Sequence, residues 1–123
     1  ICPTEDHVLS GVCEGQQRFF EEVTPAVFGR VNPEEITFCA EHRVVVDAGE
    51  VVVTMAQNNG VALTGERYDQ TYVHIFKVRD GQIWAIIECF DSALANKALW
   101  DGCNAVIPDT PAALSNLARF QEA

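Results

Sequence analysis

The stretch GERYDQTYVHIFKVRDGQIWAIIECFD, residues 65–91, decides the fold predicted for this chain. Two runs rich in β-branched and aromatic residues flank Asp80 and Gly81. Asp-Gly between such runs favours a two-residue type I′ turn, because glycine and aspartate accept the positive φ angles that this turn requires. The stretch is therefore predicted to form a β-hairpin of two long strands, and it ends on an acidic residue, Asp91.

The register of this hairpin decides which side chains share a face, because side chains alternate along a strand. With the predicted turn, His74 lies opposite Ile87 and Tyr72 lies opposite Cys89. One face then carries mostly apolar residues, with Tyr72, His74 and Asp91 near one end. A small-molecule pocket is usually lined in this way, with a few placed polar groups on an apolar surface. A slip of one residue would separate these groups.

Composition indicates a single globular domain of 123 residues, since 48% of the residues are hydrophobic and the chain can bury a core. The formal net charge is −10 and the pI is about 4.5. These values argue against nucleic acid and against an anionic membrane surface as partners, because both attract cationic proteins. No apolar run in the sequence approaches the length of a membrane span.

The cysteines and histidines show no metal-ligand spacing. The five cysteines are Cys2, Cys13, Cys39, Cys89 and Cys103, and the three histidines are His7, His42 and His74. The number of cysteines is odd and none are spaced as Cys-x-x-Cys, so neither a disulfide framework nor a zinc site is expected. The sequence predicts reduced thiols in a cytoplasmic protein that binds no metal.

The remaining elements follow from hydrophobic periodicity and turn residues. We expect an antiparallel meander in the middle of the chain and helices on either side of it. The predicted elements are a helix over 15–24 with a short turn from Pro25, strands over 35–47, 50–57, 61–78 (with Gly65 as a candidate break) and 82–90, a turn or bulge at 58–60, a helix that Asp91 or Ser92 caps through about Trp100, and a terminal helix over 112–122.

This order of elements resembles the nuclear transport factor 2-like superfamily, and within it the SnoaL-like polyketide cyclase and ketosteroid isomerase-like branch. The resemblance spans roughly residues 8–100. The segments that carry it are SGVCEG at 10–15, TGERYDQTY at 64–72, FKVRDGQI at 76–83 and ECFDSALA at 88–95.

The resemblance implies an α+β fold shaped as a cone, in which a curved, mainly antiparallel sheet packs against helices and encloses a pocket (a cystatin-like α+β barrel). It also implies a homodimer that packs sheet against sheet. The cone domain is expected over residues 1–107, followed by a helical C-terminal extension over 108–123. Members of this superfamily usually begin with one or two long helices that close the cone, and the cone domain is expected here without them.

Three residues could carry chemistry, and each has a purely structural alternative. In the resembling cyclases an acidic residue near the end of this strand is a general acid or base, a role that would fall on Asp91; the same residue could simply cap the following helix. His74 could donate to a carbonyl oxygen or be a buried core histidine. Tyr72 could stabilise an enolate, as a phenol does in ketosteroid isomerases, or only pack against Cys89. Glu88 is expected on the opposite face, paired with a cation such as Lys77.

The resemblance therefore implies cofactor-free proton transfer on a small hydrophobic carbonyl compound, of the isomerase, cyclase or epoxide hydrolase type. A non-catalytic ligand-binding protein or a dimeric scaffold of the same fold is the alternative. The side chains expected to line the pocket are Tyr68, Phe76, Ile87, Cys89, Phe19 and Trp84.

Overall fold

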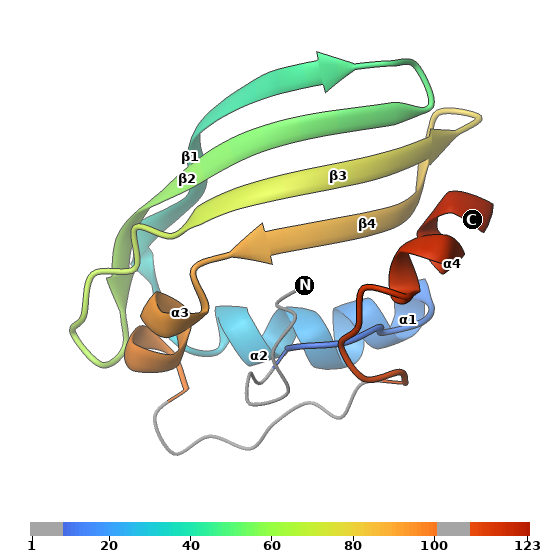
Figure 1. Cartoon of the computed structure of the whole chain (residues 1–123). Helices are drawn as coiled ribbons and strands as arrows, with labels where there is room; N and C mark the ends of the chain where they lie inside the picture. The colour runs from blue at the N-terminus through green and yellow to red at the C-terminus, as the bar shows by residue number, and fades with distance from the viewer. Residues whose placement is uncertain (1–8, 101–108) are drawn as a thin grey trace.

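The computed structural model of the protein describes residues 9–100 and 109–123. These residues form an α+β fold in which a curved antiparallel sheet of four strands, in the order β1-β2-β3-β4, lies over a layer of short helices (Figure 1). The elements in chain order are α1 (Gln16–Arg18), the π-helical turn η1 (Phe19–Val23), α2 (Thr24–Phe28), β1 (Val31–Asp47), β2 (Val51–Ala62), β3 (Thr71–Arg79), β4 (Gln82–Phe90), α3 (Ser92–Ala98) and α4 (Asn116–Glu122). The predicted class and the meander are confirmed.

The hairpin of β3 and β4 has the predicted turn. Asp80 has φ of 51° and Gly81 has φ of 74°, the two positive values of a type I′ turn. Arg79 pairs with Gln82 across it. The Asp-Gly signal therefore located both the hairpin and its first pair of residues.

The predicted register holds for only the first two pairs of this hairpin. Val78 pairs with Ile83, but Lys77 pairs with Ala85, so Trp84 is an extra residue in β4. Such a β-bulge inserts one residue into one strand and shifts every later pair by one position.

The bulge overturns the predicted composition of the two faces. His74 lies opposite Glu88 rather than Ile87, and Tyr72 no longer lies opposite Cys89. The observed pairs beyond the bulge are Tyr72↔Phe90, Val73↔Cys89, His74↔Glu88, Ile75↔Ile87 and Phe76↔Ile86. Because side chains alternate, the shift moves Ile87 and Cys89 to the other face and brings Glu88 to the face of Tyr72 and His74.

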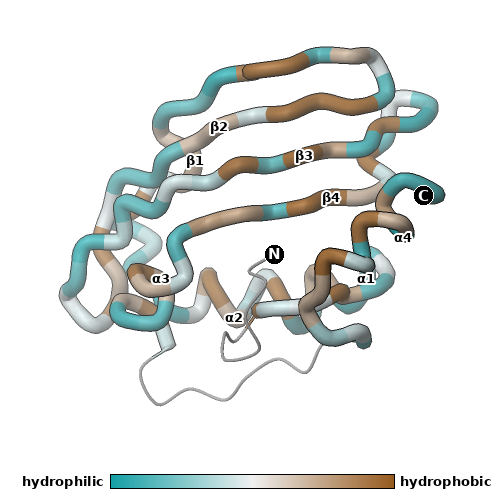
Figure 2. Tube along the Cα trace, in the orientation of Figure 1, coloured by the Kyte–Doolittle hydropathy of each residue, from teal (hydrophilic) through white to brown (hydrophobic). Residues whose placement is uncertain are grey.

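The two faces of the sheet differ in burial. We call the face that carries Tyr72 the inner face, because Ala56, Asn58 and Tyr72 are buried there. The outer face carries Met55, which is 46% exposed, and its partner Val73. Hydrophobic residues recur along the strands (Figure 2).

Strand β2 continues through the segment predicted as a turn or bulge, and the interruption lies opposite it in β1. Asn58 and Gly60 are both buried on the inner side of a regular β2. The register of β1 against β2 instead shifts between Thr37 and Glu41. The strand expected over 61–78 is not continuous, because the chain leaves the sheet after Ala62 and re-enters it at Thr71. The turn lies at the candidate break, Gly65, whose φ is 86°.

The helical segment near the N-terminus is longer than predicted and changes pitch. It runs from Gln16 to Phe28 through the π-helical turn η1. Pro25 lies in the first turn of α2 and has no amide hydrogen, so it cannot make a regular helical bond. A π turn immediately before it accommodates this gap without ending the helix.

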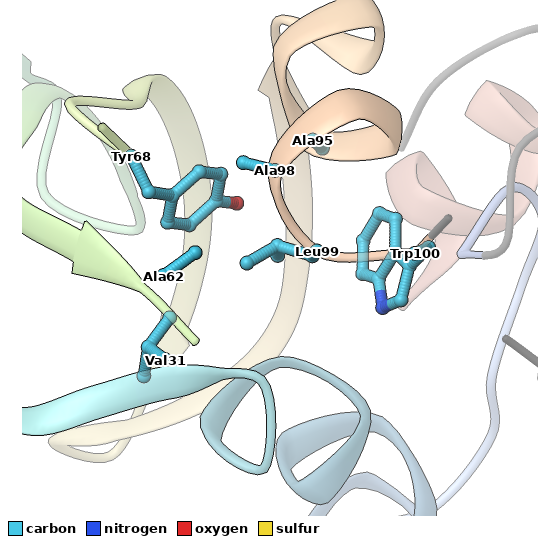
Figure 3. Packing of buried hydrophobic residues seen from close by; sticks show 7 residues of the cluster. All are labelled: Val31, Ala62, Tyr68, Ala95, Ala98, Leu99 and Trp100. Atoms are coloured by element: carbon cyan, nitrogen blue, oxygen red, sulfur yellow. The ribbon is translucent and has the colours of Figure 1, made fainter. Parts of the chain in front are cut away.

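The main hydrophobic cluster lies at the end of the sheet where α3 packs (Figure 3). Its buried members are Val31, Ala62, Tyr68, Ala95, Ala98, Leu99 and Trp100. The indole Nε1 of Trp100 donates to the carbonyl of Ala26 at 2.8 Å, which ties α2 to the segment after α3. Sequence patterning predicted α3, but only tertiary contact joins it to these distant residues.

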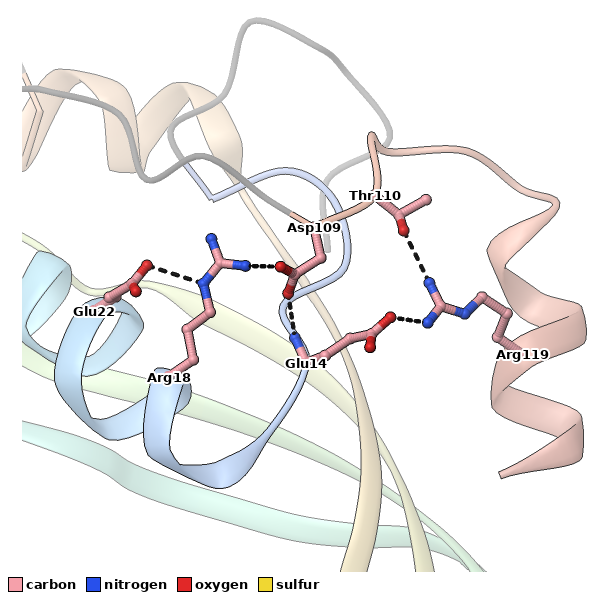
Figure 4. Close-up of polar contacts among 6 residues, drawn as sticks. All are labelled: Glu14, Arg18, Glu22, Asp109, Thr110 and Arg119. Carbon is pink, nitrogen blue, oxygen red and sulfur yellow. Dashed lines mark hydrogen bonds and ion pairs between the residues drawn. The ribbon is translucent and has the colours of Figure 1, made fainter.

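The C-terminal segment folds back against the region that precedes α1. Val12 and Thr110 form an isolated antiparallel β-bridge. Exposed ion pairs and hydrogen bonds around this bridge join Glu14, Arg18, Glu22, Asp109, Thr110 and Arg119 (Figure 4). Arg18 and the amide of Glu14 hold the pKa of the Asp109 carboxyl below its usual value, with the amide bond the larger cause. Exposed pairs contribute little individually, and backbone hydrogen bonds between Val12 and residues Asp109 and Thr110 also join the two segments.

The predicted terminal helix is confirmed as α4, which starts at Asn116 and therefore later than expected. The Lys77 ammonium donates to the carbonyls of Phe120 and Gln121, at 3.2 and 2.7 Å. A cation at the carboxyl end of a helix is favourable because the last carbonyls lack partners within the helix. The lysine that was expected to pair with Glu88 holds α4 instead.

Candidate functional site

A row of three stacked aromatic rings runs along the inner face of β3. The ring of His74 lies 5.3 Å from that of Tyr72 and 5.4 Å from that of Phe76, with interplanar angles of 15° and 27°. Alternate residues of one strand face the same side, which places these three rings in line. The imidazole is therefore held between two aromatic faces.

Glu88 completes a polar pair on this row. Its Oε1 lies 3.3 Å from Nε2 of His74, across the β3–β4 ladder. The His74 side chain is 16% exposed and the Glu88 side chain is 36% exposed. The carboxylate is therefore partly exposed while the imidazole remains mostly covered.

A hydroxyl network lies at the buried end of the same row. The Tyr72 hydroxyl lies 3.2 Å from the Tyr68 hydroxyl and accepts a hydrogen bond from Nδ2 of Asn58 at 3.2 Å. Burial raises the pKa of Tyr72 well above its usual value, and Tyr68 raises it further. Burial also raises the pKa of Tyr68. Both phenols are therefore neutral and can act as hydrogen-bond donors at any physiological pH.

Cys39 and Asn58 extend this network to β1. The Cys39 amide donates to Oδ1 of Asn58 at 3.0 Å. Burial raises the pKa of the Cys39 thiol, and the negative charge of Glu88 raises it further. Glu88 also raises the pKa of both tyrosines through its charge. The Glu88 carboxylate is the smallest of the causes in each case, and it acts on Cys39, Tyr68 and Tyr72 alike.

Asp91, the residue first expected to be the catalytic carboxylate, caps α3. Its exposed Oδ1 accepts from the amides of Ala93 and Leu94, at 3.0 and 3.1 Å. Its backbone is held by the side chain of Gln70, which donates to its carbonyl and accepts from its amide, at 2.8 and 3.0 Å. The structural alternative for this residue is thus observed, and Asp91 is not among the side chains that contact Tyr72 or His74.

Asp91→Ala is expected to lower the free energy of unfolding by about 1 kcal/mol, because a helix N-cap is lost. Asp91→Asn should keep the free energy of unfolding within a few tenths of a kcal/mol of the wild-type value, since asparagine caps equally well. Urea unfolding of the three proteins measures both differences. A large loss of stability in Asp91→Asn would show that the carboxylate charge has a further role.

The other predicted lining residues divide into two groups. Phe76 lies on the inner face beside His74, and Tyr68 is buried beneath Tyr72. Ile87 and Cys89 belong to the outer face because of the bulge, which corrects the prediction for both. Phe19 and Trp84 do not join the row either. Phe19 is 41% exposed, and its ring packs edge-on against that of Phe20. Trp84 is 57% exposed, and the Arg79 guanidinium lies 4.9 Å from the centre of its ring.

Sequence reasoning missed Glu88, Asn58 and Cys39 as members of this cluster. The sequence places Glu88 on the other face, because it carries no signal for the bulge, and it predicts Asn58 as part of a turn. The one signal available was that Glu88 interrupts an apolar strand, which leaves open the face to which it points. Three of the five cysteines, Cys13, Cys39 and Cys89, are free thiols, and Cys2, Cys103 and His7 lie outside the described residues.

Chemically, the cluster offers one carboxylate, one imidazole and two neutral phenols beside apolar rings. Such a set can accept a proton and donate hydrogen bonds to an oxygen. Within residues 9–100 and 109–123 no group of three or more histidine, cysteine or acidic side chains could hold a metal ion. In that same part of the chain, no helix has both the length and the apolar character needed to cross a membrane.

Comparison of the chain with protein-family models, with curated proteins and with solved structures found no match.

Proposed function

We propose that this protein binds a small hydrophobic ligand on the inner face of its sheet and that the ligand carries a carbonyl group. The observation that carries the proposal is the His74–Glu88 pair, 3.3 Å apart, in line with stacked aromatic rings. Apolar surface with a few convergent polar groups is the usual composition of such sites. The proposal agrees with the sequence resemblance to the SnoaL-like branch of the nuclear transport factor 2-like superfamily, including a pocket inside a cone.

In this proposal the chemistry is proton transfer without a cofactor, of the isomerase or cyclase type. Glu88 takes the place first assigned to Asp91 and removes a proton from the carbon next to the carbonyl. His74 positions the carboxylate, and the neutral hydroxyl of Tyr72 is the hydrogen-bond donor for the developing enolate oxygen. Binding without catalysis remains the alternative, and the two differ in whether Glu88 exchanges protons with a bound ligand.

Glu88→Gln tests this role, because glutamine keeps the shape of glutamate but accepts no proton. We expect deuterium incorporation next to the carbonyl of a bound steroid ketone, followed by NMR in heavy water, to slow by about 100-fold or more. Ligand affinity should change little. Glu50→Gln, at an exposed glutamate of the β1–β2 turn, is the matched control and should exchange at the wild-type rate.

Equal exchange by wild type and Glu88→Gln would contradict the catalytic role. Binding of the ketone by wild type with no exchange above the solvent rate would favour the non-catalytic alternative. The ligands to screen first are steroids, polyketides and terpenoids, by thermal shift of the wild-type protein. A ligand that contacts the row should shift the NMR signals of Tyr72, His74 and Phe76.

A second role, as a homodimer, is favoured by the outer face of the sheet. Val53, Met55, Val73, Ile75 and Ile87 share this face in adjacent pairs of the ladder. Met55 is 46% exposed and the other four are partly exposed, and contiguous apolar surface of this kind marks interaction sites. We propose that a second copy packs against it, sheet to sheet.

We also propose a cytoplasmic location for the protein. The free thiols of Cys13, Cys39 and Cys89 are compatible with it, because disulfides are rare there.

Met55→Lys is expected to weaken this dimer by about 2 kcal/mol, the scale of an interface hot spot, which is about 30-fold in Kd. The reason is that a charge would be buried against apolar partners. Sedimentation equilibrium measures the change. Leu114→Lys, at a residue that is 78% exposed and outside the sheet, is the control. A wild-type protein that sediments as a monomer at all concentrations would rule the dimer out.

A further inference from the structure

A polar hollow lies where β1 and β2 meet the loop that precedes β3, and Asn58 links its lining to Tyr72 of the aromatic row. Its volume is about 430 Å³, within the range of small-molecule sites. The residues that line it are Ala40, Glu41, Gln57, Asn58, Asn59, Arg67 and Asp69. The lining includes neither His74 nor Glu88 and none of the stacked rings.

The backbone of β1 is shaped around the hollow. The register of β1 against β2 shifts between Thr37 and Glu41, and within this interval Cys39 has a φ of 51°. A residue with a side chain rarely adopts this left-handed conformation. The buried Asn58 holds it in place by accepting a hydrogen bond from the Cys39 amide. Bulges of this kind occur often beside functional sites, where they redirect side chains.

Arg67 is fixed at the hollow although its side chain is 58% exposed. Its Nε donates to Oδ2 of Asp69 at 3.0 Å, and one terminal nitrogen donates to Oδ1 of Asp69 at 2.6 Å and to Oδ1 of Asn59 at 2.8 Å. The Gly60 amide also donates to Asp69, at 3.0 Å. The guanidinium and this amide hold the pKa of the Asp69 carboxyl below its usual value, so the pair stays ionised. The fork of the guanidinium is thus oriented before any ligand arrives.

The charges of the lining exclude most classes of ligand. The lining carries a formal charge of −1, from Glu41, Asp69 and Arg67, which disfavours a phosphate or another anion. Asp69 is already engaged by Arg67, which disfavours a bound cation. Among the described residues that line the hollow, Ala40 is the only apolar one, so an apolar ligand gains little. What remains is an uncharged ligand with several groups that both donate and accept hydrogen bonds.

We propose that this hollow binds a small uncharged polyhydroxylated compound, such as a monosaccharide or a cyclic polyol. Hydroxyl groups can donate to the carboxylate of Glu41 and to the amide oxygen of Gln57. They can also accept hydrogen bonds from the remaining amino group of Arg67 and from the side-chain amide nitrogen of Asn59. Planar side chains that bind two atoms at once suit neighbouring hydroxyls, because both contacts form in one plane. This site is separate from the His74–Glu88 pair, so either proposal can fail without the other.

The test is an NMR titration of the full chain, labelled with ¹⁵N, with methyl glucoside, methyl mannoside and myo-inositol as probes. We expect saturable shifts confined to the amides of residues 40–41, 57–59 and 67–69 for at least one probe. Gln57→Ala removes an exposed side chain and should weaken that binding about tenfold. Gln82→Ala, at an exposed glutamine of the β3–β4 hairpin, should bind as wild type does.

Arg67→Lys gives a second variant that keeps the charge but loses the fork, and it should also weaken binding at least tenfold. The dispersion of its amide signals shows whether it is folded. Three results would overturn the proposal: no saturable shift with any of the probes, equal affinity in wild type and Gln57→Ala, or saturable binding of inorganic phosphate or methylammonium at these amides in place of the polyols.

Discussion

Replacing Gly60 by alanine is expected to destabilise the protein by about 3 kcal/mol, at the upper end of the range for overpacked sites. A Cβ added at Gly60 would lie 2.4 Å from Cα of Ile36 and 2.5 Å from its Cβ. The first of these atoms belongs to the backbone, so no side-chain rotation relieves the contact. Strands β1 and β2 would have to separate where Ile36 pairs with Gly60. Urea unfolding monitored by circular dichroism measures the loss.

Gly49→Ala is the matched control for this substitution. Its added Cβ would meet nothing within 4 Å, but its φ is 77°, so the change introduces only backbone strain. We expect it to cost about 1 kcal/mol. If the two variants lose equal stability, the close approach of β1 and β2 is not what requires glycine at position 60.

Replacing Gln70 by alanine is expected to cost a similar amount, about 3 kcal/mol, because it empties a fully buried side-chain position and leaves three partly buried backbone groups without partners. Gln70 is completely buried. Its amide nitrogen donates to the Asp91 carbonyl, and its Oε1 accepts from the amides of Thr71 and Asp91. One side chain therefore joins the start of β3 to the residue that caps α3. Thermal and urea unfolding measure the effect.

The exposed Gln57 provides the control, and Gln57→Ala should stay within about 0.5 kcal/mol of wild type, as surface substitutions usually do. A second readout separates Gln70 from an ordinary cavity mutant. Amide hydrogen exchange at Ala93 and Leu94 should accelerate in Gln70→Ala, because the cap loses its support. Unchanged exchange at these amides would mean that Asp91 holds its position without Gln70.

The sequence located the turn of the decisive hairpin but not the pairing beyond it. Asp80 and Gly81 specify their own backbone angles, so a local signal was enough for the turn. The extra residue Trp84 has no such signal, because its neighbours have the same β propensity as any other strand residue. A bulge bends its strand and increases the local twist, so its position depends on the curvature of the whole sheet. No local sequence signal specifies that curvature.

The same difference accounts for the candidate site. Tyr72 and His74 were predicted to share a face because they are two residues apart in one strand, and they do. The partner carboxylate had to come from a second strand, where an error of one position exchanges one face for the other. Asp91 was therefore expected at the site, and Glu88 is there instead.

By itself the sequence determined what depends on neighbours along the chain: the α+β class, the turn at Asp80-Gly81, the cap at Asp91 and the terminal helix. These features follow from backbone preferences and from side chains that bond to amides two or three residues away. Only the tertiary structure decided that Glu88 contacts His74, that the backbone of Ile36 packs closely against Gly60, and that Arg67 is held at a polar hollow. Each of these depends on how the strands slide and bend against one another, which is set by the packing of the whole sheet rather than by any one segment.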